Sequence, residues 1–524
     1  MKVTSIGHAG FYVETAAGTV LCDPWVNPAY FASWFPFPDN SGLDWAAFRH
    51  PDYLYISHLH RDHFDPGHLR EGVSHDTTVL LPDYRTPDLE DTLRGIGFTR
   101  FVTIPSGQPV ELDSGLRVMI VALTSPSDGP IGDSALALDD GTARILNQND
   151  AKPGNLEQLR AFGPYDVHFL QFSGANWWPM VYDLSDAAKV AFGTSKRANG
   201  LARAYRYVDE VDARYVVPSA GPAAFLDAEL MAYNDLDDSP ANPFPDHSAF
   251  VEYMHEQGRD NAKLMVPGSV MTIGDGKVDV VHPGEDAFRP YHEKAKYLRA
   301  YAERRRAQIE AEKASWPATG IDFLPALKEW FEPLLAMADH ICAGVGAMLK
   351  LEIGDHTQLV VDFVEREVRP WAGERCRYRF RFAQPMVERL IADHEIDWVN
   401  SLFLSMRFSA ARVGPYNEFV YTFFKCLSPE RMAYAEQWHA TQQDELEEIQ
   451  LGSWLVQRTC PHRQADLGYF GEVEGDTLRC SMHGYEFDLT SGRCLTASDR
   501  PIRARRAAED AEPLHDERHE VPED

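Results

Sequence analysis

The sequence predicts a multidomain α/β protein with an N-terminal α/β metal domain, an α+β middle module and a C-terminal all-β domain. The chain has 524 residues, too many for one hydrophobic core. Apolar strand patterns around Gly and Ala turns fill the N-terminal part. Two groups of metal-ligand side chains, within 58–63 and 460–483, lie far apart along the chain. We expect five parts, at 1–285, 286–317, 318–435, 436–502 and 503–524.

The first strands of the N-terminal domain lead to a histidine-rich turn. Residues 3–6, 10–14 and 19–21 alternate or run apolar, and 52–57 is typical of a buried strand. The chain then reads S-H-L-H-R-D-H-F-D at 57–65. An extended backbone points His58 and His60 to the same side. Asp62 and His63 follow where the chain turns toward a helix, so four ligand-type side chains lie within six residues.

This H-x-H-x-D-H pattern at the end of a strand resembles the metallo-β-lactamase superfamily, and G-H-A-G-F-Y-V-E-T…D-P-W (7–25) is similar to the opening of its UlaG-like branch. The resemblance implies an αββα sandwich. It also implies that His58 and His60 serve one metal position and that Asp62 and His63 serve its neighbour. A bridging carboxylate is expected at the end of a later strand, and Asp150 in A-R-I-L-N-Q-N-D (143–150) fits.

Two imidazole ligands of the hydrolytic members are missing. No histidine occurs between His75 and His168, and Ser219 or Gly221 stands where a late histidine is expected. What is left can hold one metal with two histidines and one carboxylate, the ligand set of non-haem Fe(II) oxygenases. The favoured set is His58, His60 and Asp150, with Asp62–His63 as the competing pair. His8 and His168 are candidates to complete a second site, although each is more often a hydrogen-bonded core histidine.

A candidate substrate region follows another strand, in F-L-Q-F-S-G-A-N-W-W-P-M (169–180). Asn176, Trp177 and Trp178 are expected either to line a pocket or to pack at a domain contact. A small basic island lies beyond it, with Arg197 as the first candidate for binding a substrate phosphate or carboxylate. The alternative for this island, Lys196, Arg197, Arg203 and Arg206, is a solvated helix face.

The middle of the chain has few diagnostic residues. Residues 286–317 predict a long charged helix. Residues 318–435 predict an α+β module, with a helix at 323–338 and strands near 347–353, 357–364 and 375–382. Their order loosely resembles a sterol-carrier-like module. The alternating aromatic segment 416–425 predicts a strand or a partner surface.

Near the C-terminus, C-P-H and C-S-M-H are separated by seventeen residues, so each cysteine has its own histidine. This arrangement is what a Rieske [2Fe–2S] centre needs, with Cys460 and Cys480 on one iron and His462 and His483 on the other. A Cys2His2 zinc site uses the same ligand types but favours C-x2–4-C and H-x3–5-H. After it, residues 503–524 are charged and poor in apolar side chains, which predicts a disordered tail.

Composition narrows the partners and the location. The net charge of −30 argues against nucleic acid or an anionic membrane surface. It is compatible with a basic redox partner or simply with solubility. Seven cysteines do not make a disulfide framework, and no apolar run reaches the roughly 18–20 residues that span a bilayer. Because the chain starts directly on a strand pattern, we expect a cytoplasmic protein.

The two metal centres together predict an oxygenase. A Rieske centre stores one electron, and a mononuclear iron with open positions binds O2 and needs electrons to cleave it. The combination resembles the CMP-N-acetylneuraminate hydroxylase family through 13–25, 56–63 and 460–483, although that family has its Rieske part first. The resemblance implies O2-dependent hydroxylation, with electrons from NAD(P)H through a reductase and a ferredoxin or cytochrome-type donor.

The expected cofactors are a [2Fe–2S] cluster and mononuclear, or alternatively dinuclear, Fe(II). The expected substrate is a small polar amino sugar, nucleotide sugar or amine, hydroxylated or N-oxygenated. One alternative is a binuclear metal hydrolase with a redox-regulatory Rieske domain. Another is an electron carrier on an inactive scaffold. The sequence leaves the oligomeric state open, and in a homo-oligomer the cluster of one subunit can pass electrons to the iron of the next.

Overall fold

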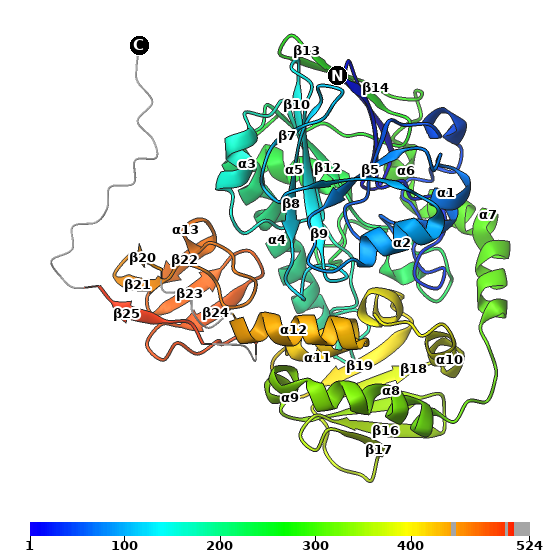
Figure 1. Cartoon of the computed structure of the whole chain (residues 1–524), viewed down its shortest axis with the longest axis vertical. Coiled ribbons are helices and arrows are strands. Elements are labelled where there is room, and N and C mark those ends of the chain that lie inside the picture. The colour runs from blue at the N-terminus through cyan, green and yellow to red at the C-terminus, as the bar shows by residue number, and fades with distance from the viewer. Residues whose placement is uncertain (442–446, 498–500, 508–524) are drawn as a thin grey trace. The chain divides into compact units, whose positions relative to one another are not determined.

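The computed structural model describes residues 1–441, 447–497 and 501–507. The chain forms two compact units, Met1–Ala440 and a second that begins at Thr441. Figure 1 shows the course of the chain through both units. Among the described residues, none of the helices is long and apolar enough to cross a membrane.

The first sheet has eight strands. Strands β1 to β3, with β13 and β14, pair antiparallel, and β3 to β6 pair parallel. The order is β14 (Lys277–Val281), β13 (Val270–Gly274), β1 (Lys2–Gly7), β2 (Gly10–Thr15), β3 (Gly18–Cys22), β4 (Tyr53–Tyr55), β5 (Thr78–Pro82) and β6 (Arg100–Ile104). Its outer face packs on α1 (Pro66–Glu71) and α2 (Asp88–Ile96), where Leu69, Leu89 and Leu93 are buried.

The second sheet packs face to face on the first. Its order is β12 (Tyr215–Ser219), β11 (Val167–Gln171), β10 (Arg144–Asn149), β9 (Asp133–Asp139), β8 (Arg117–Leu123) and β7 (Val110–Glu111). Phe11 of β2 and Phe169 of β11 meet in the shared core, with ring centroids 4.4 Å apart. Outside lie α3 (Glu157–Phe162), α4 (Asp186–Val211) and α5 (His247–Glu256). The predicted αββα sandwich is therefore confirmed (Figure 1).

Three short helical segments and one long helix complete this part. They are the 3-10 turns η1 (Trp45–Phe48) and η2 (Met231–Tyr233), α6 (Arg289–His292) and α7 (Lys294–Ser315). The long charged helix predicted within 286–317 is α7. Leu298, Tyr301 and Ile309 on one side of α7 are buried against Phe35 and Phe37, so this helix packs along the N-terminal domain.

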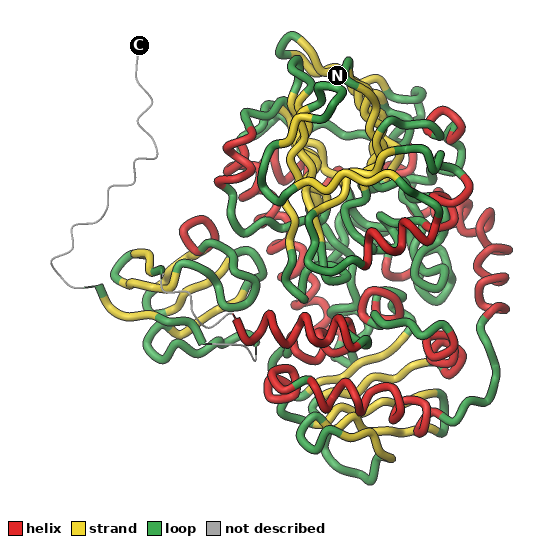
Figure 2. Tube along the Cα trace, in the orientation of Figure 1, coloured by secondary structure: helices red, strands yellow, loops and turns green. Residues whose placement is uncertain are grey.

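The middle module contains a five-stranded sheet and several helices (Figure 2). The sheet order is β17 (Glu367–Pro370), β16 (Thr357–Asp362), β15 (Met348–Ile353), β18 (Tyr378–Phe382) and β19 (Phe408–Arg412). The helices are α8 (Phe323–Met337), α9 (Asp339–Val345), α10 (Gln384–Ala392), the π-helical turn η3 (Val399–Phe403), α11 (Glu418–Lys425) and α12 (Pro429–Thr441). The predicted α+β organisation and its first helix and strands are confirmed.

The strand predicted at 416–425 is wrong. Glu418–Lys425 form α11, and Asn417 begins this helix by accepting a hydrogen bond from the Phe419 backbone N–H at 3.0 Å. Val420, Phe423 and Phe424 are fully buried. Most side chains of this short aromatic segment are buried, and the pattern of a short apolar run does not separate a strand from a helix, which is why it favoured a strand.

The middle module and the sandwich share one hydrophobic core. Trp34, Tyr182 and Phe225 of the sandwich belong to the same buried cluster as Phe331, Phe380 and Phe424 of the module. The backbones also join, because Ala410 N–H donates to Val181 C=O at 3.0 Å and Asp183 N–H donates to Ala410 C=O at 2.8 Å. Side chains of the module can therefore take part in the N-terminal site.

The second unit contains two three-stranded sheets. One has the order β20 (Glu448–Leu451), β21 (Trp454–Gln457) and β25 (Ala504–Arg506), and the other β22 (Gly471–Glu474), β23 (Thr477–Cys480) and β24 (Tyr485–Asp488). The single-turn helix α13 (Leu467–Phe470) lies between β21 and β22 in sequence. The predicted tail is wrong for 504–506, which pair with β21, and 508–524 lie outside the described residues.

Candidate metal and iron–sulfur sites

The histidine-rich turn lies at the carboxyl end of β4, which is held between β3 and β5. Phe64 N–H donates to His60 C=O at 2.7 Å, and this bond closes the turn. Asp65 then caps α1 by accepting from His68 N–H at 3.0 Å, and it also accepts from Val26 and Asn27 N–H. A buried strand and a capped helix therefore fix both ends of 58–63.

The first ligand group is His58, His60 and Asp150, which offer ligand atoms within 4.8 Å of one another. His58 Nε2 faces His60 Nδ1 at 2.7 Å, and Asp150 follows the end of β10. Burial, reinforced by His63 and His60, lowers the pKa of His58, and burial lowers that of His60. Both imidazoles are thus neutral, the form that binds a metal.

The second ligand group is His8, Asp62 and His63. His8 Nε2 lies 3.0 Å from Asp62 Oδ2, and the Tyr30 hydroxyl donates to Asp62 Oδ1 at 2.7 Å. Burial raises the pKa of Asp62, but its contact with His8 and the charge of His63 outweigh burial, and the pKa is lowered. The prediction that His8 joins Asp62 and His63 agrees with this geometry.

Asp150 connects the two groups, because its Oδ1 lies 3.5 Å from His63 Nε2. Both atoms are buried and have no hydrogen-bond partner among the described residues. Burial would lower the pKa of His63, yet Asp150 and Asp23 raise it. Two buried ligand atoms that have no hydrogen-bond partner, next to several carboxylates, form an arrangement that fits one or two divalent cations.

Asp23 and Ser57 orient the imidazoles of His58 and His63 by contacting their Nδ1 atoms. Asp23 Oδ2 lies 2.9 Å from His63 Nδ1 and accepts from the Ser57 hydroxyl at 2.6 Å. Ser57 Oγ in turn lies 2.9 Å from His58 Nδ1. Both histidines can therefore carry their proton on Nδ1 and present Nε2 as a ligand, as oriented metal-binding histidines do.

The sequence analysis did not identify Asn400. This residue belongs to η3 of the middle module, and its Oδ1 lies 2.8 Å from His60 Nε2. The two residues are 340 positions apart. No motif surrounds Asn400, so only the tertiary structure reveals the contact.

A small cavity of about 40 Å³ lies beside the two groups. Its wall includes side chains of both groups, small residues of 173–175 and 220–223, and Leu404 of the middle module. Such a volume holds about one or two water-sized molecules. A ligand-binding pocket for a larger molecule usually measures roughly 300–1,000 Å³.

Of the three residues expected either to line a pocket or to pack at a domain contact, Trp177 and Trp178 pack against the middle module, and Asn176 bonds within the N-terminal domain. Trp177 stacks on Tyr421 of the middle module, with ring centroids 5.4 Å apart. Trp178 lies under the Arg412 guanidinium at 4.2 Å, and Asn176 Oδ1 accepts from Lys196 Nζ at 2.6 Å. The alternative, packing at a domain contact, describes the two tryptophans.

Arg197 is likewise engaged within the chain. Its guanidinium donates to Asp235 Oδ2 at 2.7 Å and to Asp238 Oδ1 at 2.5 Å. Two carboxylates neutralise its charge, which argues against the predicted role in binding an anionic substrate group.

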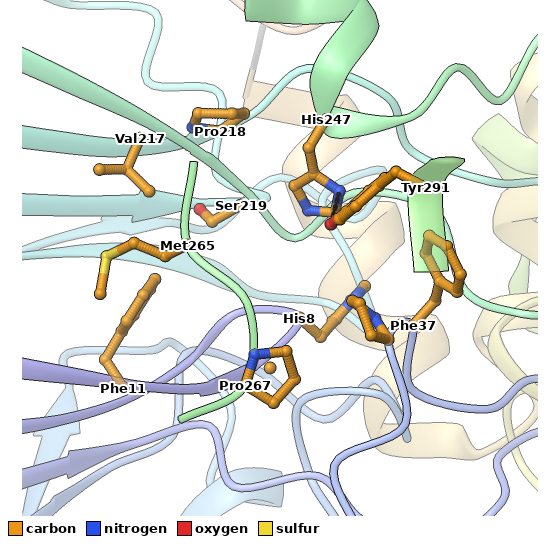
Figure 3. A pocket seen from close by; sticks show the side chains of 12 residues that line it. His8, Phe11, Phe37, Val217, Pro218, Ser219, His247, Met265, Pro267 and Tyr291 are labelled. Carbon is orange, nitrogen blue, oxygen red and sulfur yellow. Dashed lines mark hydrogen bonds between the residues drawn. The ribbon is translucent and has the colours of Figure 1, made fainter. Parts of the chain in front are cut away.

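His168 does not join either ligand group. It lies inside β11, where its Nε2 contacts Gln148 Oε1 at 2.9 Å, and burial lowers its pKa to about 3. His247 of α5 lies on the far side of His8, across a cavity of about 10 Å³ that Ser219 also lines (Figure 3). His247 belongs to neither ligand group, and its Nδ1 contacts the Tyr291 hydroxyl at 3.2 Å.

The second unit brings its four predicted ligands together on two turns. Cys460 follows β21, and its C=O accepts from Gln464 N–H at 2.9 Å; Cys480 ends β23, and its C=O accepts from Gly484 N–H at 2.8 Å. The rings of His462 and His483 lie 4.9 Å apart. Contact with the Cys460 thiol lowers the pKa of Cys480, which favours a thiolate ligand.

The burial of these ligands also fits a [2Fe–2S] cluster. Both cysteines are buried, at 2% and 1% exposure, whereas His462 and His483 are half-buried. The thiolate side of such a cluster is therefore enclosed and the imidazole side is nearer to solvent. The two histidines are therefore the more accessible pair of ligands.

The fold and these ligands define a class: a Rieske [2Fe–2S] domain in one chain with a metallo-β-lactamase-fold metal domain. Family models agree, with a Beta-lactamase superfamily domain at 2–220, an Rv3818-like, SCP2-like domain at 323–441 and a Rieske [2Fe-2S] domain at 446–503. The resemblance to a sterol-carrier-like module agrees with the second match.

The chain belongs to the family of "Putative Rieske 2Fe-2S iron-sulfur protein Rv3818" of Mycobacterium tuberculosis. The two are 49% identical over 516 residues, 97% of this chain and 100% of that protein. A Mycolicibacterium smegmatis relative, "Putative Rieske 2Fe-2S iron-sulfur protein", is also 49% identical, over 521 residues, with the same coverage. The mouse (Mus musculus) cytidine monophosphate-N-acetylneuraminic acid hydroxylase is 25% identical over 236 residues, 42% of this chain and 39% of its own.

Proposed function

We propose that the chain is a Rieske-dependent non-haem iron oxygenase, an oxidoreductase that hydroxylates or N-oxygenates a small polar substrate. One observation carries the proposal: the ligand set for a [2Fe–2S] cluster and a partly buried group of two histidines and one carboxylate occur in the same chain. The hydroxylase name of the mouse relative supports it. When iron is bound to such a group, it supplies O2 activation, because open coordination positions are left.

The first ligand group would hold that iron. His58 and His60 are neutral and face each other, so they can bind a cation without first losing a proton. Asp150 supplies the negative charge. The small cavity beside the group leaves room for only a few water-sized molecules.

In this proposal, the cluster of the second unit delivers the electrons that oxygenation needs. Oxygenation consumes one O2, two electrons and two protons, and it yields the oxygenated substrate and one water. A [2Fe–2S] cluster passes one electron at a time, so it must be reduced twice per turnover. We propose NAD(P)H as the source, through a reductase and a ferredoxin or cytochrome-type carrier.

The size of the cavity supports a proposal on the substrate class. A volume of about 40 Å³ accommodates O2 and a small reacting group, not a whole nucleotide sugar. We propose an amine or an amino sugar that inserts one polar end. A nucleotide sugar, the substrate class in the name of the mouse relative, would require Leu404 and its neighbours to move.

A binuclear hydrolase is the second candidate, favoured by the second ligand group. His8, Asp62 and His63 could hold another divalent cation joined through Asp150, and two cations can activate water. Such an enzyme would work without O2 and without a reductant.

A single-turnover experiment separates these functions. Anaerobic protein with a reduced cluster is mixed with O2 and candidate amines or amino sugars, and cluster oxidation and product are followed. We expect substrate-dependent oxidation in the wild type and its loss in His58→Ala, which keeps all four cluster ligands. Equal oxidation in both proteins would identify an electron carrier. Turnover of an ester or phosphoester without reductant would identify the hydrolase.

A further inference from the structure

We infer that the middle module completes the metal site: Asn400 is a positioning residue that fixes the proton of His60 on Nε2 and so turns Nδ1 into a metal ligand. The inference rests on the metal site of the proposed function but not on the oxygenation step. It also gives the middle module a part in the metal site.

The hydrogen bonds of Asn400 determine which way its amide points. Its Nδ2 donates to Asp397 Oδ2 at 2.8 Å and to Gly129 C=O at 3.1 Å. Both partners only accept, so the NH2 group must face them and Oδ1 must face His60 Nε2 at 2.8 Å. A carbonyl oxygen cannot donate, and therefore Nε2 of His60 carries the proton.

The proton on Nε2 leaves the lone pair of neutral His60 on Nδ1. This is the atom that faces His58 Nε2 at 2.7 Å, within the first ligand group. Asn400 thus fixes the tautomer of His60 through Nε2. Ser57 and Asp23 do the same for His58 and His63 through Nδ1. Partners of this kind set the tautomer and ring orientation of metal-binding histidines.

A chain of buried polar contacts holds Asn400 in place. Asn400 has φ −90° and ψ 17° within η3, and its N–H donates to Asp397 Oδ1 at 2.9 Å. Asp397 Oδ2 also accepts from Arg431 Nη1 of α12 at 3.2 Å, and Arg431 Nε donates to Asp88 Oδ2 of the sandwich at 3.2 Å. Both Asp397 and Arg431 are buried.

This network spans the two domains. Arg431 bridges Asp397 of the module and Asp88 of the sandwich, and Gly129 belongs to the sandwich loop beside His58. The contact therefore couples the docking of the middle module to the geometry of His60.

The test is an equilibrium titration of the chelator-treated full-length protein, cluster intact, with Zn2+ and Co2+ followed by calorimetry. We expect Asn400→Ala to weaken binding by about 10–100-fold, the usual effect of losing such a partner. The double variant Asn400→Asp/Asp397→Asn exchanges the amide and the carboxylate, keeps the net charge and restores an acceptor for His60 Nε2. We expect it to regain most of the affinity.

Asn417→Ala is the matched control, since Asn417 is a buried asparagine of the same module that bonds to Phe419 N–H and Gly344 C=O instead. We expect lower thermal stability and unchanged metal affinity. Unchanged affinity in Asn400→Ala, or no recovery in a folded double variant, would overturn the inference. Asn400-dependent binding without any O2 chemistry would refute the proposed function and leave this inference standing.

Discussion

At the scale of single residues, Asp150 has the largest influence on the proposed centre. It belongs to the first ligand group and lies 3.5 Å from His63 of the second. Burial raises its pKa, but the neighbouring His63 outweighs burial and the pKa is lowered. A carboxylate that stays charged inside the protein needs a cation beside it.

Asp150→Asn should therefore remove the metal while leaving the fold and the cluster intact. Since changes outside the ligand shell already cost roughly 10–100-fold in affinity, loss of a ligand should cost more than about 100-fold. The measurement is metal content after equilibrium dialysis. The control is Asp140→Asn, at the β9–β10 turn, where the carboxylate accepts from Thr142. Equal metal content in the three proteins would show that Asp150 is not a ligand.

At the scale of elements, α4 presents a partly buried lysine to the loop that contains the paired tryptophans. Lys196 Nζ donates to Asn176 Oδ1 at 2.6 Å and to Trp178 C=O at 3.0 Å. Burial, aided by Arg203 and Lys152, lowers its pKa from 10.5 to about 7. The helix thereby fixes the loop that contacts the middle module.

Lys196 should make stability rise with pH on the alkaline side. Between about pH 7 and 10.5 the unfolded lysine holds a proton that the folded one has lost, so the free energy of unfolding increases with pH. Lys196→Met lacks this contribution. Urea denaturation at pH 7, 8 and 9 should show the difference, wild type minus variant, increasing. A constant or falling difference would contradict the assignment.

The helix α11 offers a second test at this scale. Asn417 caps it and is fully buried. Loss of the cap and of the bond to Gly344 C=O should lower the free energy of unfolding by about 1–3 kcal/mol in Asn417→Ala. Denaturant unfolding followed by circular dichroism measures this. A stability equal to that of the wild type would show that Asn417 adds nothing to α11.

At the scale of the whole molecule, the sequence predicts features formed by residues close in sequence and misses contacts between residues far apart in sequence. The ligands within 58–63 and 460–483 are close in sequence, so their spacing alone identifies them. The αββα sandwich follows from the same turn through the family resemblance. Asn400 meets His60 across 340 residues without any pattern, and Trp177 and Trp178 resemble pocket residues until Tyr421 is seen beside them.

Each of the two units offers one set of candidate metal ligands formed from its own residues. The central claim is that both are used: a [2Fe–2S] cluster on Cys460, His462, Cys480 and His483, and a further iron on His58, His60 and Asp150. Cys460→Ala removes one cluster ligand and leaves the first ligand group untouched.

The most direct test is iron and acid-labile sulfide analysis of anaerobically purified protein beside Cys460→Ala. The account predicts about three irons and two sulfides per wild-type chain. In the variant the sulfide should disappear and about one iron should stay. Two irons and two sulfides with zinc in the N-terminal site, or with no metal there, would contradict the account.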